Sequence, residues 1–286
     1  MSLHPGAQFE GYVVRAPLGR GGSSDVYLVD DPGHSRQAVL KILDHPVGDL
    51  STARRQFHND FDIASTLHHP NVVEMLAQGE FLGQPWLTYA YGEREPGSTL
   101  IPGRRDEVDL TRALPALAEI AAALDYIHQH DVLHLDVKPH NMLIGLQGAT
   151  TVLTDFGIAH RLSDDTPLAG PDGFVPVSLA YAAPEVLRGA QIYPATDQYS
   201  LACAVVEFLT GRPPFPMPNQ FAIADAHLWA TPPDVSWRRP WIPHAVDSIL
   251  DKALAKDPRA RYDSCAEPIH LITRVLRDVE QPRAHR

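Results

Sequence analysis

The sequence has very little cysteine, because its 286 residues include only Cys203 and Cys265. Two thiols do not provide the disulfide framework of a small secreted domain, and they do not suggest a cysteine zinc site. Cys203 lies within an apolar run, where a free cysteine usually behaves as a small buried hydrophobe. We therefore expect neither disulfides nor a cysteine-based metal centre.

Long apolar runs are also missing. No stretch approaches the ~18 apolar residues that suggest a membrane span, and the first residues do not resemble a signal peptide. We expect a soluble, cytoplasmic protein, or the cytoplasmic part of a longer membrane protein. The length of 286 residues suits one large domain or two lobes.

Positive charge is scarce, with 24 lysines and arginines against 35 acidic residues and a net charge of −11. This balance argues against nucleic acid as a partner, which would favour a basic face. It does not exclude nucleotides, because a local glycine-rich loop, a lysine and Mg²⁺ can hold phosphates in an acidic protein. There are fifteen histidines, but the spacing of His128, His130 and His134 crosses a predicted helix end, so we expect no zinc site.

The N-terminal third of the chain is rich in strand signals. Residues 9–43 contain three β-rich runs, and residues 51–67 place Phe57, Phe61 and Leu67 at helical spacing. Two further strands follow, up to about residue 91. The pattern predicts a small β-rich lobe with one main helix over residues 9–91.

The rest of the chain is mainly helical in pattern. Three helices are predicted, in "LTRALPALAEIAAALDYIHQH", in the more apolar "TDQYSLACAVVEFLTG" and in "AVDSILDKALA". Gly211 is the expected stop of the second helix. The sequence thus predicts an α+β fold with two lobes, in which a larger helical lobe at 106–280 follows a linker at 92–105.

A glycine-rich segment, "LGRGGSSDVYLV" at 18–29, joins two predicted strands. It therefore differs from the dinucleotide-binding fingerprint and the Walker A loop, which lead into a helix. Gly19, Gly21 and Gly22 would let the backbone approach phosphates closely. An ordinary hairpin remains the alternative, since glycine-rich hairpins are common.

A lysine near the end of the next strand, Lys41 in "AVLK", follows three apolar residues. If its side chain points inward, the ammonium needs an acidic partner. The helix at 51–67 offers Asp60 and Asp62. Asp60 falls among apolar residues and is the inward candidate.

Two short segments carry side chains suited to phosphoryl transfer. "HLDVKPHN" contains Asp136, Lys138 and Asn141, and "TVLTDFG" places Asp155 after an apolar strand. Asp155 and Asn141 offer the oxygen ligands that Mg²⁺ prefers. Asp136 can accept the proton of an attacking hydroxyl, and Lys138 can steady the phosphoryl group. Each segment alone could be structural, but their combination and order predict a phosphotransferase.

These motifs together resemble the bacterial, Hanks-type Ser/Thr protein kinases over roughly residues 9–275. The family set of glycine-rich loop, V-A-I-K, H-R-D, D-F-G and A-P-E reads here "GRGGSSDV", "AVLK", "HLD", "DFG" and "APE". The later segments "DQYSLACAVVEFLTGRPPF" and "KDPRARY" are also similar to family motifs. The resemblance implies the two-lobed kinase fold, ATP as cosubstrate, Mg²⁺ or Mn²⁺ as metal, and proteins as substrates.

The resemblance also implies roles for individual positions. Lys138 and Ser178 favour serine or threonine over tyrosine acceptors. Glu185 is expected to pair with Arg261, and Asp197 to anchor the catalytic loop. Tyr89 would occupy the gatekeeper position of the hinge. The residues implied in nucleotide binding are Leu18, Gly19, Gly21, Gly22, Val26, Ala38, Lys41, Asp60, Tyr89, Ala90, Tyr91 and Leu143, with Asn141 and Asp155 as metal ligands.

Three positions depart from the family pattern, with Ser24 for glycine, Asp60 for glutamate and Leu135 for arginine. These departures leave a pseudokinase, which signals through nucleotide or partner binding, as an alternative function. A small-molecule phosphotransferase is a further alternative, although such enzymes generally lack the A-P-E segment and the lysine two residues after the catalytic aspartate.

Leu135 has a further implication. In related kinases the arginine at this place pairs with a phosphorylated residue of the activation loop. Leucine cannot form that salt bridge, although loop 156–182 contains Ser163, Thr166 and Ser178 as acceptors. We therefore predict that activity does not depend on phosphorylation of this loop.

Overall fold

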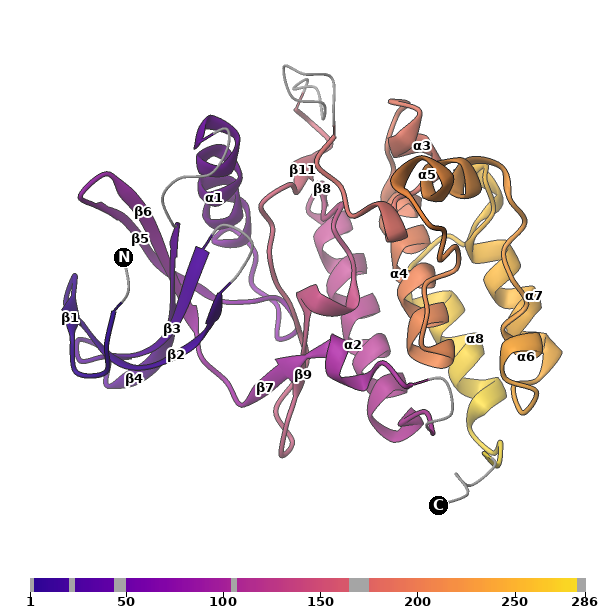
Figure 1. Cartoon of the computed structure of the whole chain (residues 1–286), viewed down its shortest axis with the longest axis horizontal. Helices are drawn as coiled ribbons and strands as arrows, with labels where there is room; N and C mark the ends of the chain where they lie inside the picture. The colour runs from indigo at the N-terminus through magenta and orange to yellow at the C-terminus, as the bar shows by residue number, and fades with distance from the viewer. Residues whose placement is uncertain (1–2, 21–23, 44–49, 104–106, 165–174, 282–286) are drawn as a thin grey trace. The chain divides into compact units, whose positions relative to one another are not determined.

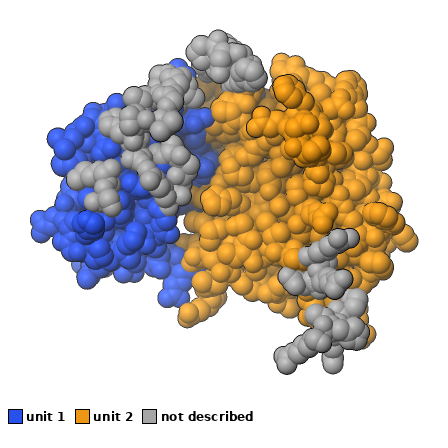
Figure 2. Space-filling view, viewed as in Figure 1, with its two compact units in different colours: residues 1–93, 155–157 blue, residues 94–154, 158–286 orange. Residues whose placement is uncertain are grey.

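The computed structural model describes residues 3–20, 24–43, 50–103, 107–164 and 175–281. The chain divides into two compact units (Figure 2). The first contains residues 1–93 and also Asp155–Gly157, and the second contains residues 94–154 and 158–286. A tripeptide from the middle of the sequence therefore belongs, by its contacts, to the N-terminal unit.

The first unit is a six-stranded antiparallel sheet with one helix, α1 (Leu50–Ala64) (Figure 1). The order across the sheet is β1-β2-β3-β4-β6-β5. The strands are β1 (Gln8–Phe9), β2 (Tyr12–Arg20), β3 (Ser24–Asp31), β4 (Arg36–Leu43), β5 (Met75–Phe81) and β6 (Gln84–Ala90). The β-rich lobe and its helix are as predicted, although the helix ends three residues before the expected Leu67.

Two clusters of apolar side chains stabilise this unit. One cluster is aromatic, with Phe9 and Tyr12 each making an edge-on contact with Trp86. The other contains Leu43, Leu87 and Phe57 of α1. The two clusters draw on alternate residues of β4, as expected for a strand whose successive side chains point to opposite faces. Helix α1 is thereby held against the sheet by Phe57.

The second unit is mainly helical, and α2, α4, α7 and α8 run side by side (Figure 1). Gly211 ends α4 in the left-handed conformation, and a Cβ there would lie only 2.2 Å from the carbonyl oxygen of Pro102. The helical elements are α2 (Leu110–Gln129), α3 (Pro184–Leu187), α4 (Pro194–Thr210), α5 (Gln220–Trp229), α6 (Val235–Arg238), α7 (His244–Ala253), α8 (Ala266–Leu276), η1 (Gly97–Leu100), η2 (Pro139–Asn141), η3 (Leu179–Tyr181) and η4 (Pro258–Ala260).

Short strands complete this unit. They form a three-stranded sheet in the order β10-β9-β7 and a two-stranded pair, β11-β8. Their bounds are β7 (Arg94–Pro96), β8 (Val132–Leu133), β9 (Met142–Gly145), β10 (Val152–Leu153) and β11 (His160–Arg161). The pairs β8–β11 and β9–β10 flank the segments that carry Asp136 and Asp155. Among the helices of the described residues, none combines the length and apolar character required to cross a membrane.

Candidate active site

The sheet register of the first unit lines up three of the predicted nucleotide-site residues. Gly19 pairs with Val26, Val26 with Lys41, and Lys41 with Leu87. Residues directly opposite each other on neighbouring strands share a face of the sheet. Val26 and Lys41 therefore project from the same face, which is the face that packs against α1 through Leu87 and Phe57.

Ala38, which the resemblance implies in nucleotide binding, lies on the opposite face of β4 from Lys41. Strand β4 pairs with β3 in an unbroken register, so its side chains alternate. Ala38 is fully buried in the aromatic cluster together with Leu40 and Ile42. Val39 lies two residues before Lys41 in β4, so its side chain faces the same way as that of Lys41.

Lys41 lies between two carboxylates of its own unit. Its Nζ is 3.0 Å from Oδ2 of Asp60 and 3.3 Å from Oδ1 of Asp155. Burial on its own lowers the pKa of Lys41, but the negative charges of Asp60 and Asp155 outweigh it, and the net shift is upward. The ammonium is therefore firmly protonated. The predicted contact between Lys41 and Asp60 is present, while Asp62 is exposed and accepts a hydrogen bond from Gln78.

The second oxygen of Asp60 has a different partner. Oδ1 accepts a hydrogen bond of 2.8 Å from the backbone N–H of Phe156, the residue after Asp155. The side chain of Asp60 is almost fully buried. One carboxylate thus binds both the lysine of β4 and the backbone of the Asp155–Gly157 tripeptide.

Asn59 adds to this attachment, and the sequence analysis did not identify it. Its Nδ2 donates to the carbonyl oxygens of Phe156, at 3.0 Å, and Gly157, at 3.2 Å. Adjacent helix residues normally point in different directions, so Asn59 and Asp60 hold the tripeptide at separate points. A polar residue beside Asp60 was the only signal in the sequence, and it belongs to no motif that we considered.

The remaining predicted residues of the first unit lie at strand ends. Leu18 is 49% exposed and Tyr91 is 36% exposed. Tyr89 is partly buried at the end of β6, where burial and the nearby carboxylates raise its pKa to about 12 despite the opposing charge of Lys41. Ala90 pairs with Ala38 in the sheet. Gly21 and Gly22 lie outside the described residues, and Ser24 is buried at the start of β3.

In the second unit, a buried aspartate organises the segment that precedes Asp136. Asp197 of α4 accepts backbone hydrogen bonds from His134 and Leu135, both at 2.8 Å. Burial alone would raise the pKa of Asp197, but the hydrogen bond and charge of His128 hold it below its usual value. Leu135 has a left-handed backbone with φ of 65°, which is uncommon for leucine and is held here by these bonds. Asp197 thus has the anchoring position that the sequence predicted.

Asp136, Lys138 and Asn141 converge on a single carboxylate oxygen. Oδ2 of Asp136 is 2.6 Å from Nζ of Lys138 and accepts a hydrogen bond of 2.9 Å from Nδ2 of Asn141. Asn141 also donates to the backbone oxygen of Asp136, which fixes its amide orientation. Lys138 donates in addition to Oγ of Ser178, at 2.9 Å. These residues of the second unit therefore form one connected group.

The other carboxylate oxygen of Asp136 has no such partner. Oδ1 is buried and accepts no hydrogen bond from the described residues. A buried acceptor without a donor is costly, and such groups in native proteins usually have a functional reason. This oxygen can accept a hydrogen bond from a hydroxyl brought to it. The adjacent strand β9 carries Leu143, which is partly buried and paired with Pro96 and Val152.

The protein-family comparison identifies this arrangement. A family model described as protein kinase domain matches residues 12–270. The chain belongs to the protein kinase domain family. The match extends over both units and includes Lys41, Asp60, Asp136, Asn141 and Asp155.

Curated relatives of this kinase domain include mycobacterial kinases. It is 37% identical over 279 residues to the serine/threonine-protein kinase PknJ of Mycobacterium tuberculosis, a match that covers 96% of this chain and 47% of PknJ. For PknF of the same organism the identity is 36% over 274 residues, covering 93% of this chain and 56% of PknF. The kinase domain therefore spans about half the length of the relatives it matches.

Solved kinase domains share its fold. The crystal structure of the M. tuberculosis PknI kinase domain has a TM-score of 0.72 at 29% identity, with 96% of this chain and 99% of that chain covered. A double mutant of the same domain gives a TM-score of 0.73 at 31% identity, with the same coverage. The predicted α+β kinase fold is thus confirmed.

A buried ion pair of the second unit also agrees with the family pattern. Arg261 donates from Nη1 to Oε1 of Glu185 at 2.8 Å and from Nη2 to Oε2 at 2.9 Å. The two side chains are 0% and 4% exposed. Arg261 also donates to the carbonyl oxygens of Ala195 and Ala255. The kinase domain therefore links the end of "APE" to "KDPRARY", as the resemblance implied.

Proposed function

We propose that this kinase domain transfers the γ-phosphoryl group of ATP to serine and threonine hydroxyls of proteins in a reaction that needs Mg²⁺. The observation that carries the proposal is the group around Asp136. One of its carboxylate oxygens is held by Lys138 and Asn141, and the other is buried with no donor among the residues that the structure describes. The names of PknJ, PknF and PknI support the same acceptor class.

The first unit contributes the residues for the nucleotide. Lys41 is protonated and positioned by Asp60, so its ammonium is available to pair with the α- and β-phosphates. Val26 and Val39 share the face of Lys41 and offer apolar surface to the base. Leu143 is a further residue proposed for nucleotide binding. Leu18, Gly19, Gly21, Gly22, Tyr89, Ala90 and Tyr91 complete the proposed nucleotide site.

Asn141 and Asp155 are the proposed metal ligands. With its amide nitrogen donating twice to Asp136, Asn141 presents its carbonyl oxygen as the remaining ligand atom. The side chain of Asp155 is 43% exposed, and its Oδ1 lies 3.3 Å from Nζ of Lys41. Both donors are hard oxygens, which fit Mg²⁺ and also Mn²⁺. The metal, when bound, neutralises charge on the phosphates.

Asp136 and Lys138 act at the acceptor. The hydroxyl of the protein substrate donates to Oδ1 of Asp136, which takes its proton as the oxygen attacks the γ-phosphorus. The bond between the γ-phosphorus and the β–γ bridging oxygen breaks, and ADP leaves with its electron pair. Lys138 steadies the phosphoryl group during transfer and neutralises charge as it develops. General base catalysis of this kind typically contributes about 10²–10⁴-fold. The bond between Lys138 and Ser178 ties the same lysine to the loop, a feature that favours serine and threonine acceptors.

Loop phosphorylation is not required in this proposal. Leu135 is 6% exposed and its backbone N–H is bound by Asp197, so the segment before Asp136 is ordered without a phosphate. An apolar side chain at this position offers no charge for a phosphorylated residue.

A transfer assay with Asp136→Asn tests the proposal. The protein is incubated with ³²P-labelled ATP, Mg²⁺ or Mn²⁺, and peptides that carry serine, threonine or tyrosine as the sole acceptor. We expect label on serine and threonine peptides, its loss in Asp136→Asn, and nearly unchanged ATP affinity. Asp225→Asn, which alters an exposed aspartate of α5, is the matched control. Bound nucleotide without any transfer would indicate a pseudokinase. Label on small molecules alone would indicate a small-molecule phosphotransferase.

A further inference from the structure

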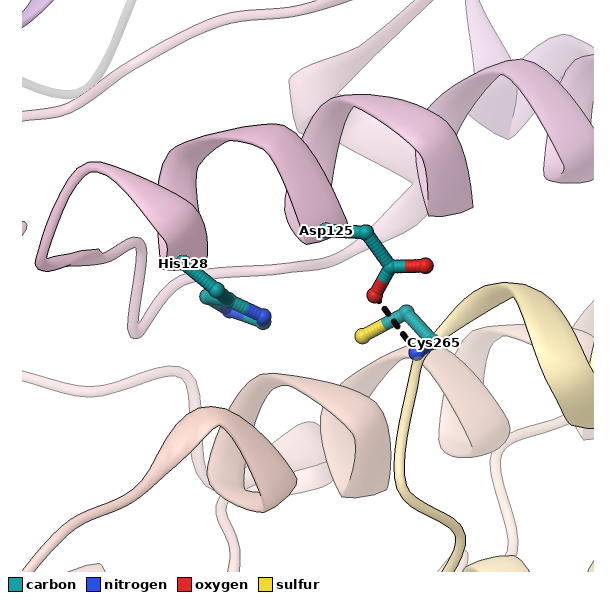
Figure 3. A group of neighbouring side chains, drawn as sticks. All are labelled: Asp125, His128 and Cys265. Carbon is teal, nitrogen blue, oxygen red and sulfur yellow. Dashed lines mark hydrogen bonds between the residues drawn. The ribbon is translucent and has the colours of Figure 1, made fainter.

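Three side chains with metal-binding donors meet between α2 and the start of α8. Asp125 and His128 lie one turn apart on α2, and Cys265 directly precedes α8 (Figure 3). One donor atom from each residue lies within 4.8 Å of the others. Cys265 is 140 positions from Asp125 in the sequence, so the group could not be recognised from residue spacing.

The carboxylate of Asp125 is already oriented by the backbone of α8. Its Oδ1 accepts a hydrogen bond of 2.7 Å from the N–H of Cys265, and Oδ2 accepts one of 3.0 Å from the N–H of Ala266. A carboxylate oxygen has two lone pairs, so each oxygen can accept a hydrogen bond and still bind a cation. Asp125 is partly exposed, which gives solvent access to one side of the group.

The Nε2 atom of the His128 ring contacts a carboxylate. Nε2 lies 2.8 Å from Oδ2 of Asp197, which leaves Nδ1 as the ring nitrogen for another ligand. Metal-binding histidines almost always donate their second N–H to a carboxylate, a backbone carbonyl or water, which fixes the tautomer and raises ligand basicity. Asp197 is a carboxylate of this kind, in contact with Nε2 of His128.

Cys265 supplies a soft donor in a site with excess negative charge. Its side chain is buried. Coordination of a divalent cation stabilises the thiolate and releases the thiol proton to solvent. One dication also balances the charges of the Asp125 carboxylate and the Cys265 thiolate.

We propose that Asp125, His128 and Cys265 bind one divalent transition metal of the zinc class, with water as the fourth ligand. The mixture of thiolate, imidazole and carboxylate matches zinc and its cobalt substitute, whereas Mg²⁺ and Ca²⁺ prefer oxygen ligands alone. The metal connects α2 to α8. Through His128 and Asp197 it is also linked to the backbone of His134 and Leu135, next to Asp136.

Cobalt binding tests the proposal on the whole chain, after treatment with a chelator to remove metal. We expect Co²⁺ to produce a thiolate-to-cobalt charge-transfer absorption that saturates at one equivalent and is displaced by Zn²⁺. The absorption should be lost in Cys265→Ser, a variant that keeps a favourable residue at the start of α8. It should be retained in Cys203→Ala, the matched control for the only other thiol.

Thermal unfolding in Zn²⁺ provides a second readout that does not depend on kinase activity. We expect Zn²⁺ to raise the Tm of the wild type and of Cys203→Ala, with a much smaller rise in Cys265→Ser and Asp125→Ala. Exposed histidines can bind Zn²⁺ weakly, so the difference between variants is decisive. The proposal is overturned if no charge-transfer absorption appears, if it survives Cys265→Ser, or if it depends on Cys203.

Discussion

Asp60 reaches Lys41 directly, with 3.0 Å between Oδ2 and Nζ, although the family pattern places a glutamate there. Aspartate is shorter by one C–C bond, about 1.5 Å. The short side chain uses its other oxygen for the backbone N–H of Phe156. The substitution therefore joins the lysine to the Asp155–Gly157 tripeptide through a single carboxylate.

Removing the charge of Asp60 is expected to impair phosphoryl transfer. In Asp60→Asn the amide can still contact Phe156, but Lys41 loses its nearest counter-charge. We expect kcat/KM to fall at least tenfold, equivalent to about 1.4 kcal/mol, with weaker ATP binding. Asp62→Asn changes an exposed acid of the same helix and should have less than a twofold effect. Equal effects of the two variants would contradict the role given to Asp60.

Asn59 is expected to stabilise the same tripeptide. Asn59→Ala removes two hydrogen bonds to Phe156 and Gly157 and should lower the free energy of unfolding by about 1–2 kcal/mol. Asn59→Asp should cost more, because a carboxylate cannot donate to two carbonyl oxygens. Denaturant unfolding measures both, with His58→Ala as the exposed neighbour on α1. A neutral result for Asn59→Asp would show that these bonds do not contribute.

The pair of Glu185 and Arg261 is expected to be essential for stability. Arg261→Ala leaves a buried carboxylate without its counter-ion, which typically costs about 3–5 kcal/mol. Arg259→Ala breaks an exposed pair with Asp257 only two residues away and should cost no more than about 1 kcal/mol. Urea denaturation of the two variants gives the comparison. Similar midpoints for both would rule out a special contribution of the buried pair.

His227 is expected to make stability depend on pH. It is fully buried, its Nδ1 lies 2.9 Å from Oη of Tyr199, and burial assisted by the charge of Lys256 lowers its pKa to about 4. Between about pH 6.5 and pH 4 the unfolded chain binds a proton that the folded chain does not, so acidification lowers the free energy of unfolding.

The size of this effect is bounded by the shift in pKa. A difference of roughly 2.5 units corresponds to about 3 kcal/mol at most. Denaturant unfolding at pH 7, 6, 5 and 4.5 should show this loss, and His227→Gln should show a flatter profile. His270→Gln, at an exposed histidine of α8, is the control. An unchanged slope in His227→Gln would assign the acid sensitivity to other groups.

Activity is expected to persist without phosphate on the activation loop. Protein co-expressed with a phosphatase should have an initial rate within tenfold of the phosphorylated form, since Leu135 cannot form the activating salt bridge. A double variant, Ser163→Ala with Thr166→Ala, should keep most of its activity; Ser163 is exposed, and Thr166 lies outside the described residues. A tenfold or greater increase on phosphorylation would show that a different cation binds the phosphate.

The sequence predicted the parts of the site that depend on spacing within one segment. Asp136, Lys138 and Asn141 lie within six positions, and their mutual contacts follow from that short loop. The contact of Lys41 with Asp60 was predicted because a buried ammonium needs an acidic partner and the helix offered few candidates. The contact of Glu185 with Arg261 was implied by the resemblance to kinases, not by the spacing of the residues.

Other features depend on register or on tertiary contacts, and the sequence did not reveal them. A shift of one residue along a strand moves a side chain to the opposite face, so the sequence did not show which residues of "AVLK" share the face of Lys41. Asn59 bonds to backbone carbonyls, which leave no trace in the sequence. The group of Asp125, His128 and Cys265 exists only because α8 begins beside α2.

The assignment of Asp155–Gly157 to the N-terminal unit has a consequence for chimeras of this protein. The first unit is not one continuous stretch of chain, so no single cut separates it from the second. A graft of residues 1–93 onto another kinase would bring Asn59 and Asp60 without the tripeptide that they hold. Asp60 contacts a backbone amide 96 positions away, and a functional graft has to transfer the two segments together.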